Sequence, residues 1–181
     1  MDLSRVHQKL AEANFFLDRL REQEQRFVGD KQPFDYYLSA FLNATTAARN
    51  GFKVRQDRAR NDRIKAWCED WESSLSPDEK QLYRFMREDR VAEHHHGGSA
   101  RERGQEGVGF GFGEHRLPEG GTIYVSGIPA PLGGDAGPPV TAYRPIYTFT
   151  IAGSERKVTD ACGAYLALLK RMVAEFEAVD R

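Results

Sequence analysis

The residues most able to do chemistry lie in one short stretch, REDRVAEHHHGG, at positions 87–98. Arg90 precedes His95 with four residues between them, and Arg87 precedes His94 with six. A histidine titrates near neutral pH and exchanges protons easily, and a guanidinium binds two oxygens of one phosphate. Positions four or five apart on a helix lie within about one turn of each other. The stretch therefore predicts acid–base chemistry at a phosphate.

Two other interpretations of this stretch stay open. Arginines and histidines near a helix C-terminus are favoured by the helix dipole, and Gly97 and Gly98 would then stop an ordinary polar helix. Alternatively, the histidines 94–96, with Glu93 and the distant His115, supply donors for a metal. Consecutive residues on a helix point about 100° apart, so three adjacent histidines cannot chelate one ion without unwinding the helix. We therefore expect neither a metal site nor a cofactor.

A second group of candidate residues forms a basic segment, RNGFKVRQDRARNDRIK, at positions 49–65. The chain has a formal net charge of −1, which argues against a generally basic nucleic-acid binder, but this segment is locally basic. Such a segment is suited to phosphate contacts and is also typical of a solvated helix face. The substrate-binding residues expected within it are Arg55, Arg58, Arg60 and Arg63.

Apolar periodicity predicts the helices that must position these residues. In each of five segments, apolar side chains recur at the spacing that forms one stripe on a helix. Ser76, Pro77 and Glu79 supply a cap, a first-turn proline and a capping-box acid in order, so the candidate stretch lies on a helix that begins there. The helices are predicted at about 3–27, 33–50, 57–73, 77–92 and 156–179.

The segment between the last two predicted helices has a different character. Residues 97–107 have no apolar periodicity and are interpreted as a flexible connector. The β-branched and aromatic runs TIYVS and VTAYRPIYTFTI are predicted to pair as a hairpin across a long loop at 127–139. Pro145 should then face a free strand edge, because proline has no N–H to donate. Residues 97–153 are therefore expected to form a glycine-rich linker and a β insertion.

Length and composition complete the expected architecture. The chain has 181 residues, of which 40% are hydrophobic and 29% charged, values typical of one globular domain. No apolar run approaches the roughly 18 residues that span a bilayer, and the N-terminus lacks a signal peptide, so a cytoplasmic protein without a membrane contact is expected. Cys68 and Cys162 form no CxxC pair and are expected to be buried thiols. The predicted fold is mainly α, a single domain over 1–181 built as a helical bundle of about five helices, with a small β-hairpin insertion before the C-terminal helix.

The order of these segments resembles the HEPN superfamily of helical-bundle proteins, many of which are RNA-cutting toxins and defence proteins. The resemblance lies in FFLDRLRE, then FDYYLSAFLNATTAARN, a Trp-containing helix and finally RFMREDRVAEHHHGG, over about residues 5–98. The family's motif is an arginine four to six residues before a histidine at a helix end. In this chain the motif is matched by Arg90 with His95 and by Arg87 with His94.

The resemblance implies RNA cleavage without a metal. Such cleavage requires a base for the ribose 2′-hydroxyl, a group that stabilises charge on the phosphorane and a proton for the departing 5′-oxygen. By analogy with the family, Arg90 would hold the phosphate and His95 would act as base or acid, with His94 and Arg87 as the competing assignment. Two motifs would meet across a symmetric homodimer and build one composite cleft.

Two hypotheses follow from these residues. The first is a metal-independent endoribonuclease of HEPN type that acts as a homodimer on RNA, as a toxin or as a stress or defence effector, with an antitoxin or another partner protein. The second is a catalytically inactive HEPN-like bundle that serves as a binding or scaffold module. In that case Val91, which stands where the family most often has a polar residue, marks the loss of a helper group.

Overall fold

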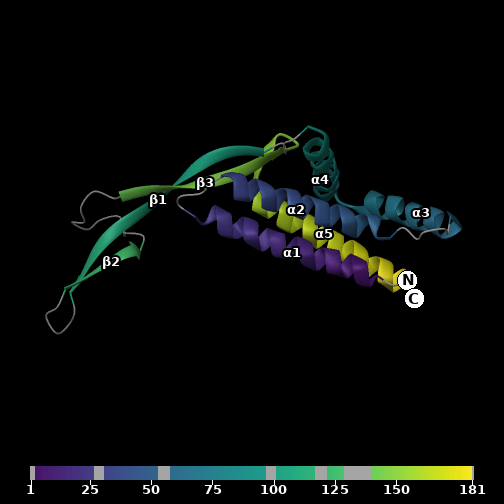
Figure 1. Ribbon diagram of the computed structural model, residues 1–181, viewed down its shortest axis with the longest axis horizontal. Helices are drawn as coiled ribbons and strands as arrows, with labels where there is room; N and C mark the ends of the chain where they lie inside the picture. The colour runs from purple at the N-terminus through teal and green to yellow at the C-terminus, as the bar shows by residue number, and fades with distance from the viewer. Residues whose placement is uncertain are drawn as a thin grey trace.

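The computed structural model describes residues 3–26, 31–52, 58–96, 101–116, 122–128 and 140–180, with side chains over 3–26, 32–52, 58–88 and 146–180. This part of the chain forms five α-helices and a four-stranded sheet (Figure 1). The helices are α1 (Ser4–Glu24), α2 (Lys31–Asn50), α3 (Arg58–Ser74), α4 (Pro77–His96) and α5 (Val158–Val179). The strands are β1 (Arg101–Arg116), β2 (Thr122–Ile128), β3 (Val140–Ile151) and β4 (Ser154–Lys157). The predicted fold, a mainly α bundle with a β-hairpin before the last helix, is confirmed.

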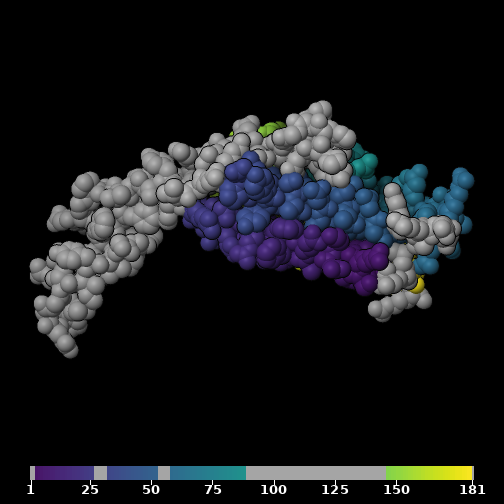
Figure 2. All heavy atoms as spheres, in the orientation of Figure 1, coloured from purple at the N-terminus to yellow at the C-terminus, as the bar shows by residue number. Residues whose placement is uncertain are grey.

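The helices α1, α2 and α5 lie side by side along the long axis of the molecule (Figure 1), and Figure 2 shows α1 and α2 in contact along their length. α1 and α5 run in opposite directions, because His7 lies 2.8 Å from Glu177 at one end and Thr159 donates a 2.7 Å hydrogen bond to Glu24 at the other. The predicted stripe of α1 is confirmed, since all of its members are buried: Leu3, Val6, Leu10, Ala13, Leu17 and Leu20. Each fully buried aliphatic side chain stabilises the fold by about 1.5–3 kcal/mol relative to exposure.

The last helix, α5, has the widest buried face among the described helices. Leu166, Leu168 and Val173 are buried beside its predicted stripe. The stripe itself is buried throughout and consists of Val158, Cys162, Tyr165, Leu169, Met172 and Phe176. A helix that buries more than one stripe packs against more than one neighbour. In α5 these neighbours include α1, α2 and α4. α5 is therefore the element around which the other helices assemble.

α4 begins as the sequence predicts and ends later than predicted. The backbone N–H of Ser76 donates a 3.0 Å hydrogen bond to Glu79 Oε2, and the backbone N–H of Glu79 donates a 3.3 Å bond to Ser76 Oγ. This reciprocal pair is the expected capping box. The end predicted near residue 92 is wrong, because the helix continues through His96. Apolar periodicity stops early in this helix, but its backbone meets no glycine or proline before Gly97.

The sheet differs from the sequence prediction in its pairing. Its strand order is β2-β1-β3-β4, and every neighbouring pair is antiparallel. The predicted pairing of TIYVS with VTAYRPIYTFTI is wrong, because β1 lies between β2 and β3, and the hairpin before α5 is formed by β3 and β4 instead. The predicted connector is also wrong over 101–107, since these residues pair with 143–149 of β3. Apolar periodicity misses this part of the strand because RERGQEG contains no alternating apolar residues.

A tight hairpin joins β3 to β4 directly before α5. Its turn has Ala152 at φ 51° and Gly153 at φ 81°, the left-handed conformations that match the twist of two antiparallel strands. β4 pairs with Thr148–Ile151 only, so Pro145 pairs with β1 on one side and lies beyond β4 on the other. The proline is therefore at a free strand edge among the described residues, as predicted.

The inner face of this hairpin belongs to the helical core. Tyr147, Phe149 and Ile151 alternate along β3 and are all buried. The Tyr147 ring stacks on Phe34 of α2 with a centroid distance of 3.6 Å, and Phe149 packs edge-on against Phe85 of α4 at 5.0 Å. The hairpin thus fixes the position of α4 relative to α2.

Two further expectations concern the cysteines and the membrane. Cys162 is buried, Cys68 is half-buried, and both are free thiols. Among the helices that the structure describes, none combines the length and the apolar character needed to cross a bilayer.

Candidate functional site

The second half of α4 carries all four residues of the predicted motif. Arg87, Arg90, His94 and His95 belong to one uninterrupted helix, and the side chain of Arg87 is exposed. The side chains of Arg90, His94 and His95 lie outside the described part of the structure. The helical backbone nevertheless fixes which positions share a face.

Helix geometry groups three of these positions and separates the fourth. Arg87, Arg90 and His94 are spaced at i, i+3 and i+7, which places them along one side of the helix. His95 is five positions after Arg90, so its position lies about 140° around the helix axis from that of Arg90. The positions of Arg90 and His94 share one side of the helix, and the position of His95 is on another side. Of the two assignments open from the sequence, the helix favours the one with His94.

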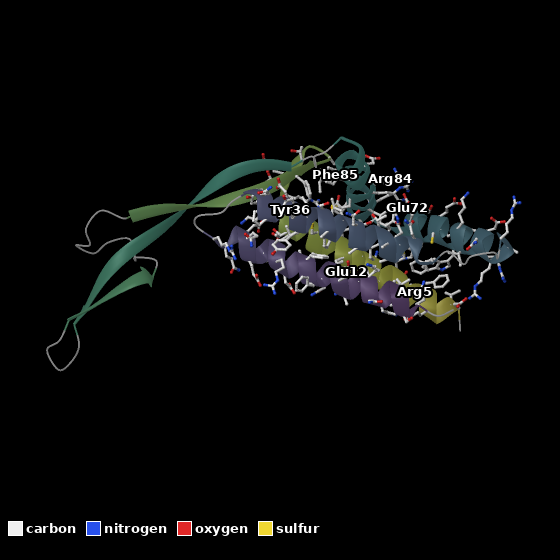
Figure 3. The ribbon with its side chains drawn as sticks, in the orientation of Figure 1. Arg5, Glu12, Tyr36, Glu72, Arg84 and Phe85 are labelled. Carbon is white, nitrogen blue, oxygen red and sulfur yellow. The ribbon has the colours of Figure 1, made fainter. Side chains whose placement is uncertain are left out.

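Arg87 lines an open cleft of about 600 Å³ on the surface formed by α3 and α4. The other described residues of this cleft are Glu72, Arg84 and Glu88. Arg84 Nε lies 3.3 Å from Glu72 Oε1, and both side chains are labelled in Figure 3. Arg87 is exposed and forms no ion pair with any residue whose side chain the structure describes.

A polar layer lies beneath the outer surface of α4. The rings of Tyr83 and Tyr165 are 5.9 Å apart, and burial raises the pKa of both hydroxyls. The charge of Arg49 partly opposes this rise in both tyrosines, and its guanidinium donates a hydrogen bond to the Tyr83 hydroxyl. The charge of Arg87 also acts on Tyr165. Both tyrosines therefore remain protonated at neutral pH and can donate a hydrogen bond.

Sequence reasoning missed the cleft partners of Arg87 and the position of Arg49. Arg84 could have been found, because it lies three residues before Arg87 on the same predicted helix. Glu72 comes from another helix, and no local pattern brings it to Arg84. Arg49 is part of the basic segment, which is suited to phosphate contacts at the surface. In the fold its side chain is half-buried and interacts with Tyr83 of α4.

The arginines of the basic segment lie apart from the cleft. Arg58, Arg60 and Arg63 are on the first two turns of α3, and Arg55 lies outside the described residues. Arg60 Nη2 donates to both carboxylate oxygens of Asp180 at 3.1 Å. Arg60 and Arg63 line a separate hollow at the end of the bundle where α3 begins. The expected substrate contacts are thus not brought together with Arg87.

Metal ligands are not clustered in the described part of the chain, where no group of three or more His, Cys, Asp or Glu side chains could hold an ion. His115 is on β1 opposite Ile123, and Glu93 and the histidines 94–96 are at the end of α4. Their side chains are outside the described set.

The comparisons with known proteins identify no relative: no protein-family model, no curated protein and no solved structure matches this chain.

Proposed function

We propose that this protein is a metal-independent endoribonuclease of HEPN type that acts as a homodimer. The observation that supports this most is the continuity of α4 through His96. It places Arg87, Arg90 and His94 along one side of a helix, with the exposed Arg87 at an open cleft. Two guanidiniums and an imidazole in this order supply a phosphate clamp and a proton carrier.

The reaction uses proton transfer and charge stabilisation alone. The 2′-hydroxyl of a ribose loses its proton to a histidine and attacks the adjacent phosphorus. The bond from phosphorus to the 5′-oxygen breaks, and a second protonated group gives that oxygen its proton. The products are a 2′,3′-cyclic phosphate and a free 5′-hydroxyl. In a homodimer, His94 of one copy acts as base and His94 of the other acts as acid, with His95 as the alternative.

The ion pairs of the cleft support a division of roles between its two described arginines. Arg84 is tied to Glu72, whereas Arg87 has no such carboxylate partner among the described side chains. An arginine that is already paired gains less from a phosphate than one that is not. Arg87 and Arg90 are therefore the proposed phosphate ligands. The proposal includes cellular RNA as substrate, a cytoplasmic location and a partner protein or antitoxin that restrains the enzyme.

Cleavage of a mixed RNA pool by the purified protein in excess chelator tests this function. We expect wild-type protein to cut and leave cyclic phosphate ends, and His94→Ala to lose activity by about 10²-fold or more. Arg87→Ala should lose activity too, whereas His95→Ala should retain most of it. His7→Ala is the matched control, because His7 is an exposed histidine on α1 that contacts Glu177. Inert wild-type protein, or equal cutting by all variants, would refute the proposal.

The charge of the cleft favours a second candidate function. Glu72 and Glu88 equal Arg84 and Arg87 in number, so the described cleft carries no net positive charge. A balanced cleft suits a protein partner better than a polyanion. The second candidate is therefore a catalytically inactive binding or scaffold module of the same fold. It predicts inert wild-type protein that captures a protein ligand, and capture that Arg87→Ala weakens.

A further inference from the structure

A hollow of about 590 Å³ opens at the end of the bundle where α3 begins and α5 ends. Figure 1 shows this end of the molecule on the side away from the strands. Two classes of side chain line it. Ile64, Trp67, Phe176 and Val179 form its apolar part, and Arg60, Arg63 and Asp180 form its charged part. The combination of one indole with guanidiniums distinguishes this hollow from the cleft at Arg87.

The apolar wall is rigid and partly open to solvent. Ile64 and Phe176 are buried, and Trp67 is half-buried. The Trp67 ring meets the Phe176 ring edge-to-face, with centroids 4.9 Å apart and planes at 76°. Val179 at the rim is 71% exposed. A ring that core packing holds in place loses little freedom when a flat ligand stacks against the wall.

The two guanidiniums differ in how they are held. Arg60 is held by both carboxylate oxygens of Asp180, which neutralise much of its charge. Its side chain therefore helps to form the wall of the hollow more than it attracts an anion. Arg63 is exposed and forms no ion pair with a described residue. Arg60, Arg63 and Trp67 follow one another at steps of three and four, so they share one face of α3.

We propose that this hollow binds one nucleotide of a single-stranded RNA, with the base against Trp67 and a phosphate on Arg63. A flat aromatic surface beside an exposed guanidinium fits a base joined to a phosphate. An acidic peptide would satisfy the guanidinium and leave the flat wall unused. The inference rests on the proposed ribonuclease function and adds to it a subsite that holds the substrate away from the point of cleavage.

Binding of a dye-labelled 2′-O-methyl oligoribonucleotide, followed by fluorescence anisotropy, tests the subsite without cleavage. The methyl group blocks the attacking oxygen, so every variant can be compared on intact ligand. Trp67→Leu should weaken binding at least fivefold, the lower range for one lost base stack. Arg63→Gln should weaken binding and lower the slope of log K against log salt by about 0.7. This second variant leaves the contact between Trp67 and Phe176 intact.

Lys65→Gln is the control, because Lys65 is on the same helix, pairs with Glu69 and does not line the hollow. Equal binding by Arg63→Gln and Lys65→Gln would overturn the subsite. A poly-glutamate peptide that competes as well as RNA of equal charge would overturn it in favour of a peptide site. Intrinsic fluorescence adds a direct readout, since RNA should quench Trp67, and Trp67→Phe should abolish the quenching because Trp71 is buried.

The experiments distinguish failure of the proposed subsite from failure of the proposed nuclease function. The subsite is refuted, and the nuclease function is not, if wild-type protein cuts RNA, His94→Ala does not, and both Trp67→Leu and Arg63→Gln bind RNA as wild type does. RNA that is bound through Trp67 and Arg63 but never cut supports the subsite and refutes the enzyme.

Discussion

The carboxylate of Glu79 connects the first turn of α4 to α5. Arg171 donates a 2.8 Å hydrogen bond to Glu79 Oε1, and the backbone of Ser76 donates to the other oxygen. The bond from Arg171 is the main cause that lowers the pKa of Glu79 from 4.5 to about 2, with the Ser76 bonds adding to it. The ionised form is therefore favoured in the folded chain.

The pH dependence of stability follows from this lowered pKa. Because the folded pKa is below the unfolded value, the contribution of Glu79 is complete above about pH 4.5 and is lost as the pH falls toward 2. We expect Glu79→Gln to lower the urea midpoint at pH 7 and to approach wild type near pH 2. Glu22→Gln, in an exposed pair with Arg19, is the control and should change little. An equal deficit at both pH values would contradict the assignment.

The surroundings of two glycines predict opposite changes in stability when each is replaced by alanine. A Cβ at Gly51 would lie 2.8 Å from Val6 Cγ2 and 3.1 Å from the carbonyl oxygen of Ala48, so Gly51→Ala should destabilise by about 1–3 kcal/mol. A Cβ at Gly163 would lie 3.4 Å from the flexible end of Arg21, so Gly163→Ala should stabilise by about 0.5–1 kcal/mol. Urea unfolding of both variants measures the two signs, and two changes of the same sign would contradict the packing around one of them.

At the scale of elements, the hairpin of β3 and β4 is part of the core. Phe149→Ala should cost about 3–5 kcal/mol, because the ring is buried against Phe85 and leaves a cavity. Thr150→Ala, at the next and exposed position of the strand, should cost less than about 0.5 kcal/mol. Chemical denaturation compares the pair. A small loss for Phe149→Ala would mean that the hairpin is an appendage.

The helices could be predicted from the sequence, because the spacing of apolar residues directly records which face is buried. The stripe from Leu3 to Leu20 and that from Val158 to Phe176 illustrate this, since the predicted members are all buried. The alternation of Tyr147, Phe149 and Ile151 likewise predicted a strand. The order of the strands could not be predicted, because pairing of β1 with β3 depends on backbone partners far apart in the chain.

The candidate site was predictable only along one helix. Arg87 and His94 appear in one segment, so their common helix follows from local patterns. The pairing of Arg84 with Glu72 and the half-buried position of Arg49 arise where helices meet, and no local pattern contains them. The preference for His94 over His95 required the end of α4, which apolar periodicity placed four residues too early.

At the scale of the whole molecule, the proposed homodimer predicts that His94→Ala is dominant over wild type. The composite cleft uses His94 of both copies, so a heterodimer of wild type and His94→Ala lacks one of its two proton carriers. Unfolding and refolding wild-type protein together with an excess of His94→Ala should therefore lower the activity per wild-type chain well below that of wild type refolded alone. RNA cleavage by the mixture measures this. Unchanged activity per wild-type chain would mean that each cleft is built from one chain.

The arrangement of α5 has a consequence for synthesis. This helix follows the other four in the chain, and its Glu177 is joined to His7 near the start of α1. A nascent chain that has not yet reached α5 can pack α1 against α2, but the apolar surfaces that α5 covers on α1, α2 and α4 stay exposed to water. The bundle is therefore completed only when α5 has been synthesised, and the earlier part of the chain carries apolar surface that favours aggregation until then.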